Sequence, residues 1–125
     1  MKAPTWQLIL LVLAGLAGLL AAPGQASAQV AGREALVMTL DGPLSRSMVE
    51  YVRRGIETAD RQDAEVLILE LNTPGGSVTL MNELVRDIRA SLVPVVVYVA
   101  PSGSMAASAG TLITLAGHAA AMAPE

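Results

Sequence analysis

The chain is 125 residues long, which leaves room for one small domain at most. It contains no cysteine, so disulfide bonds do not hold it together. Its net charge is −3 and its arginines are scattered among carboxylates, a balance that gives no support to nucleic-acid binding. The only lysine is Lys2 and the only histidine is His118.

The N-terminal segment has the features of a secretory signal peptide. Residues 8–22 are an uninterrupted run of Leu, Ile, Val, Ala and Gly, and Ala26-Ser27-Ala28 follows as a small-residue cleavage site. A retained membrane anchor is the alternative, but the run is shorter than the roughly 20 residues that a membrane-spanning helix needs. We therefore expect a signal peptide over residues 1–28, and a folded unit outside the inner membrane over residues 29–125.

Strand-like and helix-like patterns then alternate along the chain. Three short apolar runs predict strands, at residues 35–40, 65–71 and 93–100. The second run, EVLILEL, is apolar on consecutive residues and is typical of a strand covered on both faces. Apolar residues at three- and four-residue steps predict a helix with its N-cap at Ser45 and a second helix over Thr79–Ala90.

The stretch after the third strand is rich in Ala, Gly and Ser and predicts a third helix. On that helix Ser104 would lie one turn before Ser108. The alternation of strands and helices predicts an α/β fold, with parallel strands joined by right-handed crossovers.

Two junctions between a strand and the following helix are candidates for chemistry, because helix N-termini present unpaired backbone N–H groups. At the first, Asn72-Thr73-Pro74-Gly75-Gly76 offers two successive glycine N–H groups to an oxyanion, and an ordinary tight turn is the alternative. At the second, PSGSMAASAG offers serine hydroxyls between small residues, and close helix packing is the alternative. The second stretch lacks the Gly-x-Ser-x-Gly spacing of an α/β-hydrolase.

Together and in this order, LNTPGGSV and MAASAGTLITLAG resemble the ClpP-type serine proteases, which share their fold with crotonases and include signal peptide peptidase A. The chain is similar to the membrane-bound branch encoded beside stomatins, the NfeD-like or stomatin operon partner proteases. The resemblance extends from residue 35 to the last residue. It implies a ClpP/crotonase-like fold of repeated β-α units with a parallel sheet, incomplete at the C-terminus. It also implies Ser108 as the catalytic nucleophile, and Gly75, Gly76 and Ala109 as sources of oxyanion-hole N–H groups.

A base for Ser108 is missing from residues 29–125. Ser102 and Ser104 are competing hydroxyls, but the family match and the small neighbouring residues favour Ser108. His118 lies about 15 Å further along a continuous helix and is interpreted as a helix-end or surface residue. The resemblance implies instead a neutral lysine roughly forty residues beyond the serine. We expect the chain to be the N-terminal piece of a longer protease domain and to be inactive by itself.

The resemblance implies a serine endopeptidase of the Ser-Lys dyad type at the outer face of the membrane, acting on hydrophobic segments of membrane proteins such as stomatin-like partners. A non-enzymatic, stomatin-associated partner at the membrane surface is an alternative. A crotonase-fold acyl-CoA enzyme is a second one, which the export signal disfavours. The resemblance further implies a membrane-associated homo-oligomer, exported to the periplasm or another extracytoplasmic location. We expect no cofactor, no metal and no nucleic-acid partner.

Overall fold

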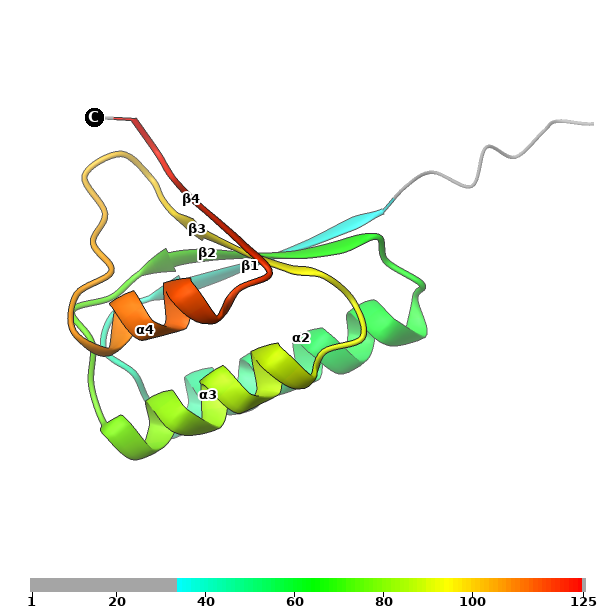
Figure 1. The fold of residues 1–125 in the computed structure, drawn as a ribbon, viewed down its shortest axis with the longest axis horizontal. Helices are drawn as coiled ribbons and strands as arrows, with labels where there is room; N and C mark the ends of the chain where they lie inside the picture. The colour runs from blue at the N-terminus through cyan, green and yellow to red at the C-terminus, as the bar shows by residue number, and fades with distance from the viewer. Residues whose placement is uncertain (1–33, 125) are drawn as a thin grey trace, which may run out of the picture. The chain divides into compact units, whose positions relative to one another are not determined.

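The computed structural model describes residues 34–124, and in them strands and helices alternate along the chain. One parallel sheet has the order β1-β2-β3-β4, and its strands are β1 (Ala35–Asp41), β2 (Val66–Asn72), β3 (Val95–Val99) and β4 (Ala119–Met122). The connecting helices are α2 (Arg46–Arg61), α3 (Val78–Ala90) and α4 (Ala109–Ala116). Figure 1 shows that these helices lie on the same side of the sheet. The expected α/β class and the parallel strands are confirmed, whereas the predicted signal peptide lies outside the described residues.

The core lies between the helices and the sheet face that they cover. Every second residue of a strand points to the same face, so Leu67, Leu69 and Leu71 of β2 are all fully buried against the helices. The helices contribute buried side chains at the three- and four-residue spacing of an amphipathic face, among them Val49, Val52, Leu84, Ile88 and Ile113. Full burial of each such side chain stabilises the fold by roughly 2 kcal/mol.

Serine side chains mark the beginnings of α2 and α3. Ser45 Oγ accepts a hydrogen bond from the Met48 N–H at 3.2 Å, which confirms the predicted N-cap. Ser77 Oγ accepts a longer bond, 3.5 Å, from the Leu80 N–H. Both helices therefore begin directly after the turn that ends the preceding strand.

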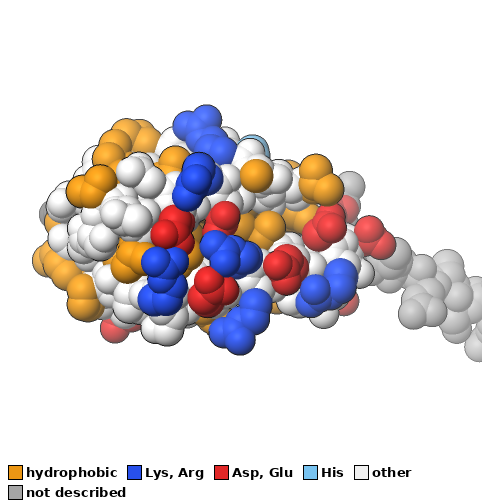
Figure 2. Space-filling view, turned by 90° about the horizontal axis from the view of Figure 1, so that it is seen from below, with side chains coloured by type: hydrophobic (Ala, Val, Ile, Leu, Met, Phe, Trp, Pro, Cys, Tyr) orange, Lys and Arg blue, Asp and Glu red, His pale blue; other side chains and the backbone are white. Residues whose placement is uncertain are grey.

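Ion pairs connect α2 and α3 on the solvent side. Arg46 pairs with Glu83, and Arg53 reaches Asp87 at 3.2 Å and Glu50 at 2.8 Å. Figure 2, seen from the helix side, shows acidic and basic side chains interleaved over this surface. Asp87 first and Glu50 second raise the pKa of Arg53 above its usual value. Exposed ion pairs of this kind contribute little to the free energy of unfolding. Their main effect is on the alignment of α2 with α3.

The segment between β3 and α4 differs from the prediction of one long helix. Residues 101–107 form an irregular loop, and α4 begins only at Ala109. Pro101 and Gly103, whose φ is +82°, lie in this loop and interrupt a helix that the Ala-rich composition favours. Ser104 consequently lies in a turn, where its N–H donates to the Pro101 carbonyl at 3.0 Å, and not on the same helix as Ser108.

The other face of the sheet is uncovered within residues 34–124, because the helices lie on one side only. Ile68 and Glu70 of β2 are partly exposed, and Val37 of β1 is 51% exposed. β4, which no sequence pattern predicted, is exposed along its whole length. This sheet therefore offers an uncovered face and an open edge at β4.

Candidate active site

Ser108 immediately precedes α4 and has a backbone conformation that L-amino acids rarely adopt, with φ 52° and ψ −116°. Such conformations cost about 1–3 kcal/mol each, persist only where the surrounding structure enforces them, and cluster at functional sites. Within residues 34–124 Asp63 is the other non-glycine residue with positive φ, in a turn that its short polar side chain tolerates. The Ser108 side chain is exposed and its hydroxyl does not cap α4, so the hydroxyl is available for reaction.

The turn made by Gly75 and Gly76 packs directly against Ser108. Gly75 has φ +105°, a conformation that favours glycine. A Cβ atom at Gly75 would lie 2.9 Å from Ser108 Cβ and 3.2 Å from the Ala109 nitrogen. Because real Cβ atoms do not approach so closely, the contact exists only while residue 75 is glycine. The structure thus brings the four residues predicted for the site to one place, where the β2–α3 turn meets the start of α4.

The hydrogen bonds of this turn distinguish among the predicted oxyanion donors. The Gly75 N–H already donates to Thr73 Oγ1 at 3.1 Å. Within residues 34–124 the N–H groups of Gly76 and Ala109 donate to no protein acceptor. The N–H of Ala109 belongs to the first residue of α4, where the helix dipole adds a partial positive charge. Gly76 and Ala109 therefore have free donors, and Gly75 contributes its small size.

The end of β2 holds the loop that leads to Ser108. The Thr73 N–H donates to the Met105 carbonyl at 2.7 Å, and the Thr73 carbonyl accepts from the Ala107 N–H at 3.0 Å. The Met105 N–H donates to Asn72 Oδ1 at 3.0 Å, and Asn72 Nδ2 donates to Asp41 Oδ1 at 2.7 Å. These bonds extend the sheet by one bridge beyond β2. The sequence interpretation gave no supporting role to Asn72 or Thr73. The signal that could have found them is that two polar residues directly follow the apolar run of residues 65–71.

The competing candidates from the sequence lie in other environments. Ser102 and Ser104 belong to the 101–107 loop and not to α4. His118 follows the end of α4 as interpreted, and its Nδ1 accepts a hydrogen bond from the Val95 N–H at 3.1 Å. Since Val95 begins β3 and the loop to Ser108 leaves from the other end of β3, His118 lies at the opposite end of that strand from Ser108.

Residues 34–124 contain no lysine. Among the same residues no group of three His, Cys, Asp or Glu side chains is arranged to hold a metal ion. None of the described helices combines the length and apolar character needed to cross a membrane.

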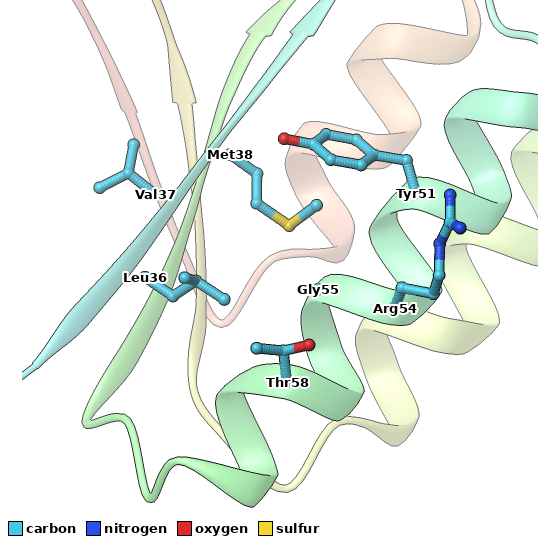
Figure 3. A pocket seen from close by; sticks show the side chains of 7 residues that line it. All are labelled: Leu36, Val37, Met38, Tyr51, Arg54, Gly55 and Thr58. Carbon is cyan, nitrogen blue, oxygen red and sulfur yellow. The ribbon is translucent and has the colours of Figure 1, made fainter.

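A separate hollow of about 420 Å³ lies between β1 and α2. In Figure 3, Leu36 and Met38 point from β1 toward α2, Tyr51 and Arg54 extend from α2, and Val37 points away. The lining contains no histidine, lysine or carboxylate that could act as a base. Unlike the Ser108 region, this hollow is lined by no residue with a strained backbone conformation, so the Ser108 region remains the candidate active site.

Comparison with protein families identifies one that covers most of the chain. The model of the NfeD1b N-terminal domain matches residues 35–125. The chain is 42% identical over 88 residues to the membrane-bound protease PH1510 of Pyrococcus horikoshii. The match covers 70% of this chain and 20% of that protein, so the chain spans about a fifth of the length of this relative.

Solved structures with a similar fold include the 1510-N membrane-bound stomatin-specific protease of Pyrococcus horikoshii. Its serine-to-alanine mutant is 40% identical, with a TM-score of 0.71, over 72% of this chain and 44% of that chain. Its lysine-to-alanine mutant in complex with a substrate peptide is 41% identical, with a TM-score of 0.70. That match covers 72% of this chain and 41% of the mutant chain. An asparagine-to-aspartate mutant of ClpP1 from Listeria monocytogenes is 21% identical, with a TM-score of 0.59. The match covers 65% of this chain and 46% of the ClpP1 chain, and it shows the fold alone. The expected ClpP-like fold and the resemblance to this protease branch are confirmed.

Proposed function

The chain belongs to the NfeD1b N-terminal domain family, and on this premise we propose that it carries the nucleophile and the oxyanion hole of a serine endopeptidase of the Ser-Lys dyad type. The observation that carries the proposal is the strained Ser108, which has a free hydroxyl, packs against Gly75, and is followed by the free N–H of Ala109, while Gly76 next to Gly75 also has a free N–H. A curated relative named as a membrane-bound protease supports it. Backbone strain at an exposed, unbonded hydroxyl has no structural benefit, whereas it suits a nucleophile.

In this mechanism Ser108 Oγ attacks the carbonyl carbon of the scissile peptide bond while its proton passes to a base. The carbonyl oxygen becomes an oxyanion and accepts hydrogen bonds from the Gly76 and Ala109 N–H groups. The C–N bond then breaks, the leaving amine takes the proton from the base, and an acyl-enzyme ester remains on Ser108. Water hydrolyses this ester, with the same base accepting the proton of the water.

We propose a lysine kept neutral by burial as that base. The relative solved with a substrate peptide carries a lysine-to-alanine substitution, which supports a lysine in this role. Residues 29–125 contain no lysine. These residues by themselves therefore hold a nucleophile and oxyanion donors without the proposed base, and we expect them to be inactive alone.

The proposed substrates are hydrophobic segments of membrane proteins such as stomatin homologues. Large apolar side chains close in sequence to the site residues are exposed: Val78 is 66% exposed, and Met105 and Leu112 are each 51% exposed. Exposed apolar groups near a catalytic centre offer contact area to an apolar peptide. The name of one relative, a stomatin-specific protease, agrees with this substrate class.

We further propose that the protein acts at the outer face of a membrane, in the periplasm or another extracytoplasmic space, as a membrane-associated homo-oligomer. The support is the signal-like N-terminal sequence and a relative described as membrane-bound.

N-terminal sequencing of the exported protein should begin at Gln29. A start at Met1 in the membrane fraction would show that the leader is retained.

One observation favours a competing function. Because residues 29–125 lack a lysine, the chain can instead be a non-enzymatic partner of a stomatin-like protein at the membrane surface. A serine-directed fluorophosphonate probe separates the two proposals, since it reacts with an activated serine and not with an ordinary surface hydroxyl.

The test compares Ser108→Ala with Ser104→Ala in the protein expressed from its complete reading frame. Ser108→Ala should lower peptide cleavage by on the order of 10⁶ and remove fluorophosphonate labelling, because the acyl-forming oxygen is gone. Ser104→Ala removes a hydroxyl in the preceding turn. It should leave peptide cleavage and fluorophosphonate labelling close to the wild-type level. Circular dichroism checks that both variants fold.

Two results would contradict the proposal. Loss of activity with Ser104→Ala and not with Ser108→Ala would identify a different nucleophile. A folded wild-type protein that neither cleaves peptide nor reacts with the probe would favour the non-enzymatic partner.

A further inference from the structure

We propose that Thr73 is a positioning residue that sets the distance between the Gly75-Gly76 turn and Ser108. The inference rests on the proposed protease function, because that distance matters only if the two sides form one oxyanion hole. Thr73 is the only polar residue among those fully buried within residues 34–124. Its burial keeps it from touching substrate, so its effect must pass through the groups that it contacts.

The hydroxyl of Thr73 fixes the glycine turn. Its Oγ1 accepts the Gly75 N–H at 3.1 Å, and the Gly75 carbonyl lies 3.5 Å from the same oxygen. A buried backbone N–H requires an acceptor, so without this oxygen the Gly75 N–H would have to turn toward another partner. The peptide plane that carries the Gly76 N–H contains the Gly75 carbonyl, which accepts from Thr73 Oγ1 at 3.5 Å and from the Leu44 N–H at 2.9 Å, so Thr73 and Leu44 orient this plane together.

The methyl group of Thr73 determines how closely α4 approaches. A Cβ atom at Gly110, in the first turn of α4, would lie 2.6 Å from Thr73 Cγ2. The backbone of α4 at Gly110 therefore packs directly against the Thr73 methyl group, which only a glycine at residue 110 permits. The Ala109 N–H belongs to the residue before Gly110, so the same contact places the second oxyanion donor.

The backbone of Thr73 connects both contacts to the sheet. It bonds to Met105 and Ala107 in the loop before Ser108, and it follows the last residue of β2, a strand paired on both sides. One residue thus touches the turn, the loop and the helix that surround the reacting atoms. Because a displacement of about 1 Å at an active site can lower turnover by about 10²-fold, loss of either contact should be measurable.

The first test separates the hydroxyl from the methyl group. Thr73→Val keeps the size and shape of the side chain but removes the acceptor for the Gly75 N–H. In the protein expressed from its complete reading frame, kcat should fall by roughly 10- to 100-fold with KM nearly unchanged. The rate of Ser108 labelling by fluorophosphonate should fall in parallel. Thr73→Ser keeps the hydroxyl and loses only the methyl contact, so its kcat should lie between those of Thr73→Val and the wild type.

The second test adds a methyl group at residue 110 and removes one at residue 73. Gly110→Ala should lower kcat, because its Cβ meets Thr73 Cγ2 and pushes α4 away from the turn. Thr73→Ser removes the atom that is in the way, so the double variant should be more active than Gly110→Ala alone. This exchange keeps the inference testable if Thr73→Val does not fold. A role in stability alone would change the folded fraction measured by circular dichroism without changing kcat per folded molecule.

The outcomes distinguish this inference from the function on which it rests. If the wild-type protein is labelled at Ser108, wild-type kcat in folded Thr73→Val overturns the inference and leaves the proposed function intact. Failure of Thr73→Ser to rescue Gly110→Ala also overturns it. If the folded wild-type protein is not labelled, the proposed function fails and the inference fails with it.

Discussion

At the scale of single residues, the candidate site depends on how closely two backbones approach each other. Gly75 meets Ser108 at a distance that no Cβ atom permits, and Ser108 itself has a strained backbone conformation. The strain is held by neighbours, among them the loop bonds to Thr73. A glycine at residue 75 is therefore a requirement of the geometry.

Gly75→Ala should abolish most Ser108-dependent activity. The methyl group would meet Ser108 Cβ, and the positive φ adds a conformational cost of about 1–2 kcal/mol. Gly42→Ala is the matched control, because Gly42 has φ +95° but no atom within 4 Å of its hypothetical Cβ. Gly42→Ala should lose only the stability that the positive φ costs, Gly75→Ala should lose more in thermal unfolding, and only Gly75→Ala should lose fluorophosphonate labelling. Equal labelling of the two variants would show that the contact with Ser108 is not needed.

At the scale of elements, the chain places each helix by its N-terminus. Ser45 and Ser77 cap α2 and α3 with side-chain oxygens, whereas Ser108 precedes α4 without capping it. A capping oxygen accepts the N–H two or three residues later, as Ser45 Oγ does from Met48, so the absence of a cap at α4 leaves the Ser108 hydroxyl itself unbonded. The same residue type thus stabilises two helices and is available for chemistry at the third.

Ser45→Ala should destabilise the protein by about 1 kcal/mol, because the Met48 N–H loses its acceptor at the start of α2. Ser45→Asp should keep most of the stability, since a carboxylate also caps a helix and suits its positive end. Ser47→Ala is the control, as the Ser47 hydroxyl bonds only to Ser45 Oγ within the described residues. Midpoints of urea unfolding measure the differences. A loss from Ser47→Ala as large as that from Ser45→Ala would contradict the assignment of the cap.

At the scale of the whole molecule, the described residues form a sheet with helices on one side only. The opposite face carries partly exposed apolar side chains, and β4 is an exposed edge strand. Uncovered apolar faces and open strand edges are surfaces that other chains can join. Within residues 34–124 nothing covers them.

Residues 29–125 expressed alone should be poorly soluble and inactive. The uncovered sheet face and the β4 edge favour association, and no lysine is present to accept the Ser108 proton. Size-exclusion chromatography, a casein assay and fluorophosphonate labelling test both statements. A soluble monomer with turnover that depends on Ser108 would disprove them and make His118 the first base to examine by substitution.

Local patterns were sufficient for much of the fold. The alternation of apolar runs and amphipathic periods predicted three of the four strands and the helices α2 and α3, and Ser45 was recognised as a cap. These signals succeed because hydrophobic periodicity and capping depend on residues within a few positions of each other. The resemblance in two short motifs selected Gly75, Gly76, Ser108 and Ala109, which the structure brings together.

Contacts between distant segments decided the rest. β4 is an alanine run with little strand preference, and it forms by pairing with β3. The start of α4 at Ala109 depends on loop bonds to Thr73, and composition alone favoured a longer helix. Sequence by itself therefore determined which residues could do chemistry, and the tertiary structure decided which N–H groups are free to assist them. The physical reason is that a backbone N–H acquires its partner, or remains free, only when segments far apart in the sequence come together.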